Sequence, residues 1–423
     1  MPDQVNAQVV VFPFTRQFDG NEVNIGRADG MNFLALPSDA VEILDRLAAG
    51  DSIGEAQAFY KNRYGELPDV EGLVSALEAE GFVRRATSAA LNKGESKGAY
   101  LVRFHCSWFP QAWGQRIFSR PVLLISGVLV AMALLAIAAD PKIVPGPSSL
   151  LFSARLGLSM LWLAPLFVLQ ICLHELSHMA AARSCGVRVR FGVSHRLWLL
   201  VLETDMSGVW TLPPRQRYLP ILAGSFVDAV SASVMILILA AAARGLFVLS
   251  SVELGILRAL LVIYFYQITW QCFLFVRTDF YYALANLFGC KNLLTDTTTY
   301  LRNLLVRSTG KGSVREQSAV PAGEMKIVRW YSILWLLGRL LAFYILIFFQ
   351  IPIVYSYLKL MWRALKAALS GGLMVSPTVL VPAGFSLIIF AVGMFLWIRS
   401  MRSHSTPTQL ETSSVPISLE KGV

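Results

Sequence analysis

The chain has few charged residues. Asp, Glu, Lys and Arg make up 15% of its 423 residues, whereas 55% are hydrophobic. Together with a mean hydropathy of +0.56, this deficit of charge argues against an ordinary soluble protein and is typical of chains that cross a membrane several times. The region after Met1 also lacks a basic stretch followed by an apolar core, so we expect no cleavable signal peptide.

Cysteine is scarce as well. The five cysteines are odd in number, widely spaced and without a Cys-x-x-Cys pair. This pattern argues against a disulfide framework and against a zinc site built from thiolates. Small apolar fillers in or near helices are the simpler interpretation.

Long apolar runs are what the chain does have. Six of them approach the roughly 20 residues that a helix needs to cross the hydrocarbon core of a bilayer. They are Val122–Ala139, Leu156–Ala182, Leu219–Ala243, Leu257–Val276, Ile333–Tyr355 and Val379–Ile398. We therefore expect a mainly α fold, a polytopic membrane helix bundle of about six spans.

Charge divides the chain near residue 90. Residues 1–90 carry seven Lys/Arg and fourteen Asp/Glu, a net charge of −7, whereas residues 91–423 carry thirty and thirteen, a net charge of +17. The first part is acidic enough to be soluble, and the second is basic in a way that suits loops lying against anionic lipid. Nucleic acid is not needed to explain the positive charge, and we expect none as a partner.

Residues 1–86 read as a small α+β domain with a winged-helix-like shape. Gln8–Phe14 and Asn32–Leu36 have the β-branched and aromatic content of strands. Three short helices follow, each with a polar residue at its start and a glycine at its end. The starts are Ser38, Ser52 and Asp69, and the ends are Gly50, Gly65 and Gly81. Winged helices usually bind DNA, but a net charge of −7 over residues 1–90 repels phosphate.

A family resemblance offers another role for this domain. Leu34-Ala-Leu-Pro-Ser-Asp-Ala-Val-Glu-Ile-Leu, the helix ending at Tyr64-Gly65 and the closing Leu77-Glu-Ala-Glu-Gly-Phe-Val resemble PqqD-like domains, which recognise leader peptides of ribosomally made, modified peptides. The resemblance covers about residues 5–86. It implies that a peptide binds by adding a strand to the edge of the domain's sheet.

The next segment reads as a connection. Thr87–Gly98 is rich in Ser, Gly, Lys and Asn, so we expect a flexible linker, and aromatic residues interleave with arginines in Tyr100–Arg120. We expect the latter to be a helix lying on the membrane surface, so that residues 87–120 join two domains. Further on, Val187–Leu202 alternates polar and apolar residues, which favours either a hairpin that could offer an edge to an extended peptide or an ordinary loop.

The second apolar run contains the pattern most suggestive of chemistry. It includes His174-Glu175-Leu-Ser-His178. On a helix, His174 and His178 project from one face and can hold one metal ion, while Glu175 lies beside them, placed to take a proton from a metal-bound water. A polar trio facing a water-filled cleft without metal is the alternative. Asp228 in the third run is another ionisable group that needs a partner or a cavity.

A second resemblance extends this motif. The stretch Arg277-Thr-Asp-Phe-Tyr-Tyr is similar to the Asp-Gly-Tyr-Tyr segment of site-2-protease-like membrane metallopeptidases, which also carry His-Glu-x-x-His on a membrane helix. Phe280 stands where that family usually has Gly. The resemblance covers about residues 120–300, and implies zinc bound by His174, His178 and Asp279 with Glu175 as the catalytic residue. It leaves residues 301–423 as a loop, two more spans and a disordered tail.

From these observations we expect a membrane-embedded zinc metalloendopeptidase that cuts a precursor peptide or a membrane-associated protein. The alternative is a catalytically idle relative that binds modified peptides for export or immunity, with an exporter or a modifying enzyme as partner. Cleavage of an anti-sigma factor is a third hypothesis, but no loop outside the cytoplasm is long enough for the expected peptide-binding insertion. Arginines follow the helix that carries His174 and His178, and residues 291–329 are also basic. Basic loops favour the cytoplasmic side, so we expect a multi-pass protein of the cell membrane whose N-terminal domain is cytoplasmic.

Overall fold

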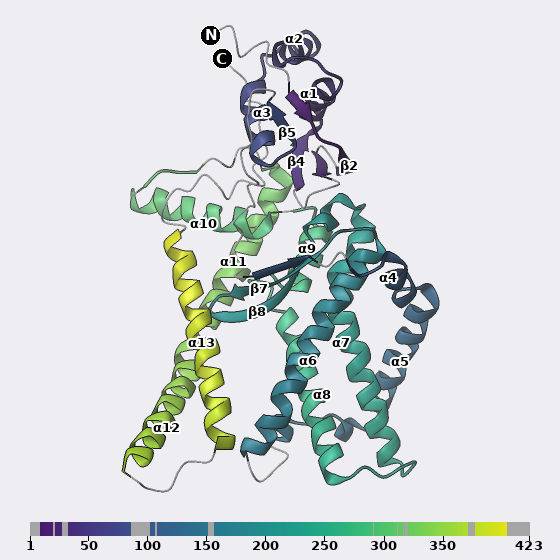
Figure 1. The fold of residues 1–423 in the computed structure, drawn as a ribbon, viewed down its shortest axis with the longest axis vertical. Helices are drawn as coiled ribbons and strands as arrows, with labels where there is room; N and C mark the ends of the chain where they lie inside the picture. Colours follow the sequence, from purple (N-terminus) through teal and green to yellow (C-terminus); the bar gives the residue numbers. More distant parts are fainter. Residues whose placement is uncertain are drawn as a thin grey trace.

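The computed structural model describes residues 9–19, 22–27, 33–85, 102–105, 108–150, 156–290, 292–310, 312–315, 317, 320–370 and 377–403. A small domain of strands and short helices precedes a bundle of long helices (Figure 1). The expected fold class, a helical membrane bundle preceded by a small α+β domain, is confirmed. The expected linker at 87–98 and the expected tail after residue 403 lie outside the described residues.

The N-terminal domain contains two small antiparallel sheets. One pairs β1 (Val9–Val11) with β5 (Val83–Arg85), and the other has the order β2 (Phe14–Asp19), β3 (Glu22–Arg27), β4 (Phe33–Pro37). The expectation of one strand over Gln8–Phe14 was wrong. Pro13 lies between β1 and β2, and proline cannot donate a ladder hydrogen bond, so the chain starts a new strand after it.

Three helices complete this domain, α1 (Ser38–Ala48), α2 (Ile53–Tyr64) and α3 (Val70–Ala79). Ser52 and Glu55 form a reciprocal capping box at α2, and the Asp69 carboxylate accepts from the amide of Gly72 at α3. Ser38 does not cap α1 as expected, because it is already the first helical residue and follows Pro37. Apolar side chains from the strands and from all three helices form one buried core.

Six helices among the described residues are long and apolar enough to cross a membrane, so the chain is a multi-pass membrane protein by length and composition. They overlap all six apolar runs of the sequence. The helices concerned are α5 (Arg120–Ala139), α6 (Leu156–Ser184), α7 (Pro214–Ala243), α8 (Ser251–Gln271), α11 (Ala322–Ile345) continued by α12 (Ile351–Leu369), and α13 (Pro377–Ser403).

The fifth span is much longer than expected. A π-helical turn, Leu346–Gln350, joins α11 to α12 without a break, and the resulting helix has 48 residues. At 1.5 Å per residue it is on the order of 70 Å long, which exceeds the roughly 40–45 Å of a bilayer with its headgroups. Its ends therefore extend beyond the membrane. The expected span Ile333–Tyr355 is only its most apolar middle.

A three-stranded sheet lies across the upper part of the bundle (Figure 1). Its order is β6 (Val102–His105), β7 (Arg190–Arg196), β8 (Leu199–Asp205), all antiparallel. The hairpin alternative for Val187–Leu202 is therefore confirmed. The expectation of a surface helix over Tyr100–Arg120 was wrong at its start, because Val102–His105 is a strand that pairs with β7. Helix begins at α4 (Gln111–Ile117).

Short elements connect the long helices. The 3₁₀ turns are η1 (Pro141–Ile143), η2 (Pro147–Leu150) and η3 (Ser207–Thr211), and the short α-helices are α9 (Asp279–Leu287) and α10 (Leu293–Thr309). The N-terminal sheet rests on η3: the Asn24 side chain in β3 is buried and donates to the carbonyl of Trp210 at 3.0 Å. The two parts of the chain thus meet directly after β8.

Candidate metal centre

Helix α6 presents two histidines toward the protein interior. His174 and His178 are four residues apart and therefore lie on one face of the helix. Their side chains are buried, with 4% and 3% of each residue exposed. Their Nε2 atoms are 3.2 Å apart. Two nitrogen atoms that close, in one buried spot, are arranged as a pair of ligands would be.

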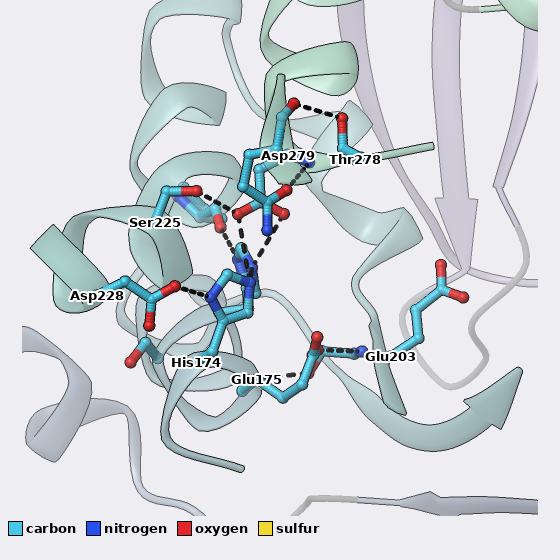
Figure 2. A network of polar contacts seen from close by, with 12 residues as sticks. His174, Glu175, Glu203, Ser225, Asp228, Thr278 and Asp279 are labelled. Atoms are coloured by element: carbon cyan, nitrogen blue, oxygen red, sulfur yellow. Dashed lines mark hydrogen bonds and ion pairs between the residues drawn. The ribbon is translucent and has the colours of Figure 1, made fainter. Parts of the chain in front are cut away.

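Helix α7 fixes the orientation of both rings. His174 Nδ1 lies 2.7 Å from the Asp228 carboxylate, and His178 Nδ1 lies 2.8 Å from the carbonyl oxygen of Pro220 (Figure 2). Carboxylate and carbonyl oxygens accept hydrogen bonds, so each Nδ1 carries the proton and each Nε2 keeps its lone pair. Asp228, which the sequence left without a partner, thus lies behind His174.

Asp279 supplies the third group from the first residue of α9. One carboxylate oxygen is 3.2 Å from His178 Nε2, and the other is 3.4 Å from His174 Nε2. Ser225 on α7 donates its hydroxyl to this carboxylate at 2.7 Å. The Asp279 carboxylate therefore faces both imidazoles and is held in place by Ser225.

The start of α9 is itself held in place. Thr278 caps the helix, and its hydroxyl donates to the carbonyl of Gln271 at the end of α8. The Gln271 side-chain oxygen accepts from the backbone amide of Asp279 at 3.0 Å. Gln271 is buried and joins the end of α8 to the start of α9.

Gly224 on α7 leaves the space that a metal ion would need. A Cβ atom at this position would lie 2.5 Å from His178 Nε2 and 2.6 Å from His174 Nε2. Zinc bonds nitrogen and oxygen at about 2.0–2.1 Å in a tetrahedron, so its ligand atoms are about 3.3 Å apart. Taking one atom from each of His174, His178 and Asp279, the ligand atoms lie within 4.8 Å of one another. The two Nε2 atoms are 3.2 Å apart, and each is 3.2 to 3.4 Å from a different oxygen of Asp279, which are separations of the size that such an ion needs.

Glu175 lies beside this group but turns its carboxylate toward β8 (Figure 2). Its Oε2 accepts from the backbone amide of Thr204 at 2.7 Å, and the Thr204 hydroxyl donates to the Glu175 carbonyl at 2.9 Å. The carboxylate is therefore bound to the sheet through one oxygen. Thr204, like Gly224 and Ser225, carried no signal in the sequence.

Comparison with known proteins adds no relative: no protein-family model, curated protein or solved structure matches the chain significantly. The argument for a function therefore depends on the residues of this site.

Proposed function

We propose that the protein is a membrane-embedded zinc metalloendopeptidase of the site-2-protease type. The observation that carries the proposal is the group formed by the buried His174 and His178 and the half-buried Asp279. Each Nε2 atom is 3.2 to 3.4 Å from the other Nε2 and from an oxygen of Asp279, beside the gap left by Gly224. Two imidazoles and one carboxylate are a common ligand set of catalytic zinc, which keeps a fourth position open. Zinc held there would supply the Lewis acid for peptide hydrolysis.

Glu175 is the group proposed to take a proton from the attacking water and to pass it to the leaving amine. The Thr204 amide donates to its Oε2, so Oε1 is the oxygen proposed to accept this proton. Fixing one oxygen to β8 holds the carboxylate in one orientation, and this contributes to catalysis by positioning. Asp228 and Pro220 have the supporting task of keeping both imidazoles in the metal-binding tautomer.

The route of the substrate is proposed to involve the N-terminal domain. A peptide bound at the edge of that domain's sheet would lie close to η3, on which the sheet rests through Asn24 and Trp210. Only Met206 separates η3 from β8, so the domain and the strand next to Glu175 belong to one connected region. We propose a precursor peptide, ribosomally made and modified, as the substrate class.

One observation favours the alternative function. The hydrogen bonds of Glu175 to Thr204 would give that carboxylate a structural role even in a protein that only binds peptides. A binder for export or immunity would need the N-terminal domain but no proton transfer. Both functions use the same site. A protease should lose hydrolysis when Glu175 can no longer accept a proton, whereas a binder should keep its affinity for the peptide.

The test is Glu175→Gln. Glutamine keeps an oxygen that can accept from the Thr204 amide but cannot take up a proton, so zinc content should be unchanged while hydrolysis falls by about 10²–10⁴-fold. The measurement is zinc by mass spectrometry and new peptide termini from an unstructured peptide library incubated with the purified protein.

Glu203→Gln is the matched control, because Glu203 is a nearby carboxylate that pairs with Arg196 at 2.6 Å outside the ligand group. It should hydrolyse peptides as the wild type does. Equal cleavage by Glu175→Gln and wild type, or no cleavage by zinc-loaded wild type, would contradict the protease assignment and favour the binder.

A further inference from the structure

Helix α10 crosses the direction of the membrane helices. In Figure 1 it runs horizontally, whereas α11 and α13 run steeply, and it lies at the level where α13 ends. Its first half packs on α11: Leu293 shares a buried cluster with Val328 and Tyr331, and Leu294 and Tyr300 pack against that cluster. The helix then continues away from α11.

The face that packs on α11 remains apolar beyond it. Leu301, Leu304 and Leu305 have the i, i+3, i+4 spacing that continues this face in the second half of the helix. Leu304 is 53% exposed and Leu305 is 62% exposed. Large apolar side chains with that exposure, on a helix anchored to a membrane bundle, are unusual for a surface in contact with water.

Two arginines lie on either side of this leucine face. At 100° per residue, Arg302 and Arg307 fall roughly 100° to each side of Leu301, and both are exposed. No acidic residue occurs between Thr297 and Thr309. Leucines flanked by arginines whose stems can extend to either side are typical of a helix lying in the headgroup layer.

The opposite face is already occupied by protein. Asn303 is buried. Its side-chain amide donates to the Arg315 carbonyl at 2.8 Å, and its side-chain oxygen accepts from the Arg315 backbone amide at 2.8 Å. Gln317 donates to the Asp296 carbonyl at 2.9 Å. The segment after α10 thus folds back over this face. The helix therefore cannot rotate to hide its leucines, and within the described part of the chain the leucine face is the one that protein leaves uncovered.

We propose that the second half of α10 is an anionic-lipid-binding surface, with Leu301, Leu304 and Leu305 in the acyl boundary and Arg302 and Arg307 at the headgroup phosphates. Charge complementarity selects an acidic lipid over a neutral one. A basic side chain at the surface of an anionic leaflet favours such lipids by about 1 kcal/mol, or about fivefold. This surface is separate from the metal centre and does not depend on peptide hydrolysis.

The experiment uses the full chain in lipid nanodiscs that contain equal amounts of phosphatidylglycerol and phosphatidylcholine. A benzoylphenylalanine photo-crosslinker replaces Leu304, and the adducts are identified by mass spectrometry. We expect lipid adducts in which phosphatidylglycerol exceeds phosphatidylcholine about fivefold. The same crosslinker at Thr299, on the far side of the helix and half-buried, should give few lipid adducts.

The double variant Arg302→Gln and Arg307→Gln should keep lipid adducts at position 304 but bring the two lipids to equal yield. Both arginines are exposed, so the fold should tolerate the change. Adducts to a second copy of the chain, or no lipid adducts at position 304, would overturn the proposal. An excess of phosphatidylglycerol that persists in the double variant would overturn the role of the arginines.

Discussion

Each imidazole of the candidate metal centre has one nitrogen bound to α7 and one turned inward. The Nδ1 atoms contact Asp228 and Pro220, while the Nε2 atoms face each other across the space beside Gly224. The two Nε2 atoms are 3.2 Å apart and each lies near an oxygen of Asp279, so the three groups could share either protons or one cation. Substitutions around them that affect a bound cation in different ways make separable predictions.

Gly224→Ala should abolish zinc binding. The added Cβ would come within 2.5 Å of His178 Nε2, where an ion would have to sit, so zinc content should fall from about one per chain to near zero. The measurement is metal analysis of purified protein after dialysis. Gly127→Ala in α5, where a Cβ would meet nothing within 4 Å, is the matched control and should retain zinc.

Asp279→Ala should lower zinc occupancy strongly, as should His174→Ala and His178→Ala, because each removes a ligand. Asp228→Asn should act more weakly, by about 10–100-fold in zinc affinity, since it weakens the contact that orients His174 without removing a ligand. Competition with a metal chelator measures both effects. Full zinc content in Asp279→Ala would show that Asp279 is not the third ligand.

At this scale the sequence predicted which side chains come together better than it predicted what surrounds them. The spacing of His174 and His178 places both on one helix face, and an expected resemblance to a family singled out Asp279, which lies beside them. The contacts of Gly224, Ser225 and Thr204 arise only when α6, α7 and β8 pack together. A small or hydroxyl-bearing residue in an apolar helix has no local pattern that marks such a contact.

At the scale of elements, the β7–β8 hairpin is fixed at both ends. Thr204 joins the end of β8 to α6 through Glu175. At the other end, the Trp198 indole donates to Gln350 in the π-helical turn at 3.2 Å, and the Trp198 carbonyl faces Gly393 of α13 so closely that a Cβ would overlap it. Helix α13 therefore covers the start of β8, which is an edge strand of the sheet. A peptide that paired along the whole edge of β8 would require α13 to shift.

Gly393→Ala should loosen this contact. The clashing atom is a backbone carbonyl, which cannot rotate away, so we expect a loss of about 1–3 kcal/mol of stability. Gly384→Ala in the same helix meets nothing within 4 Å and should be neutral or stabilising by up to about 1 kcal/mol. Thermal unfolding of both variants in one detergent gives the comparison. Similar midpoints would show that α13 and the hairpin are not in close contact.

Elements were predictable where an apolar run or an alternation extends over many residues. The six spans are of the first kind, and β7 and β8 are of the second. The sequence did not predict β3 or β6, because these short strands are stabilised mainly by their partners, β2 and β4 in one case and β7 in the other. Nor did it predict how far the α11–α12 helix continues. Charged residues follow the apolar run, and Pro352 is a helix-breaking signal, but the helix passes it directly after the π-helical turn.

At the scale of the whole molecule, the hydrophobic core of the N-terminal domain is separate from the clusters of the membrane part. The N-terminal domain buries side chains from Val9 to Val83 in a cluster of its own, whereas the clusters of the membrane part contain none of them. A buried guanidinium reinforces the junction between the two parts: Arg217 donates to the carbonyl oxygens of Trp210 and Leu212. It holds η3 in the shape on which the domain rests.

The self-contained core leads to the last prediction, that residues 1–86 fold without the membrane part. The fragment should unfold cooperatively, since all its strands and helices contribute to one core. It should bind an extended peptide through main-chain hydrogen bonds at a sheet edge. Duplex DNA should not bind, because residues 1–90 carry seven basic against fourteen acidic residues and would repel phosphate.

Circular dichroism during thermal unfolding tests the first part, and titration against peptides encoded by neighbouring genes and against duplex DNA tests the second. Proline substitutions in the bound peptide provide the control, because proline removes the amide that pairs with a strand while leaving the other side chains in place. They should weaken binding at alternate positions. Tight DNA binding at physiological salt, or peptide binding that ignores proline, would contradict recognition by strand addition and with it the delivery of a substrate to Glu175.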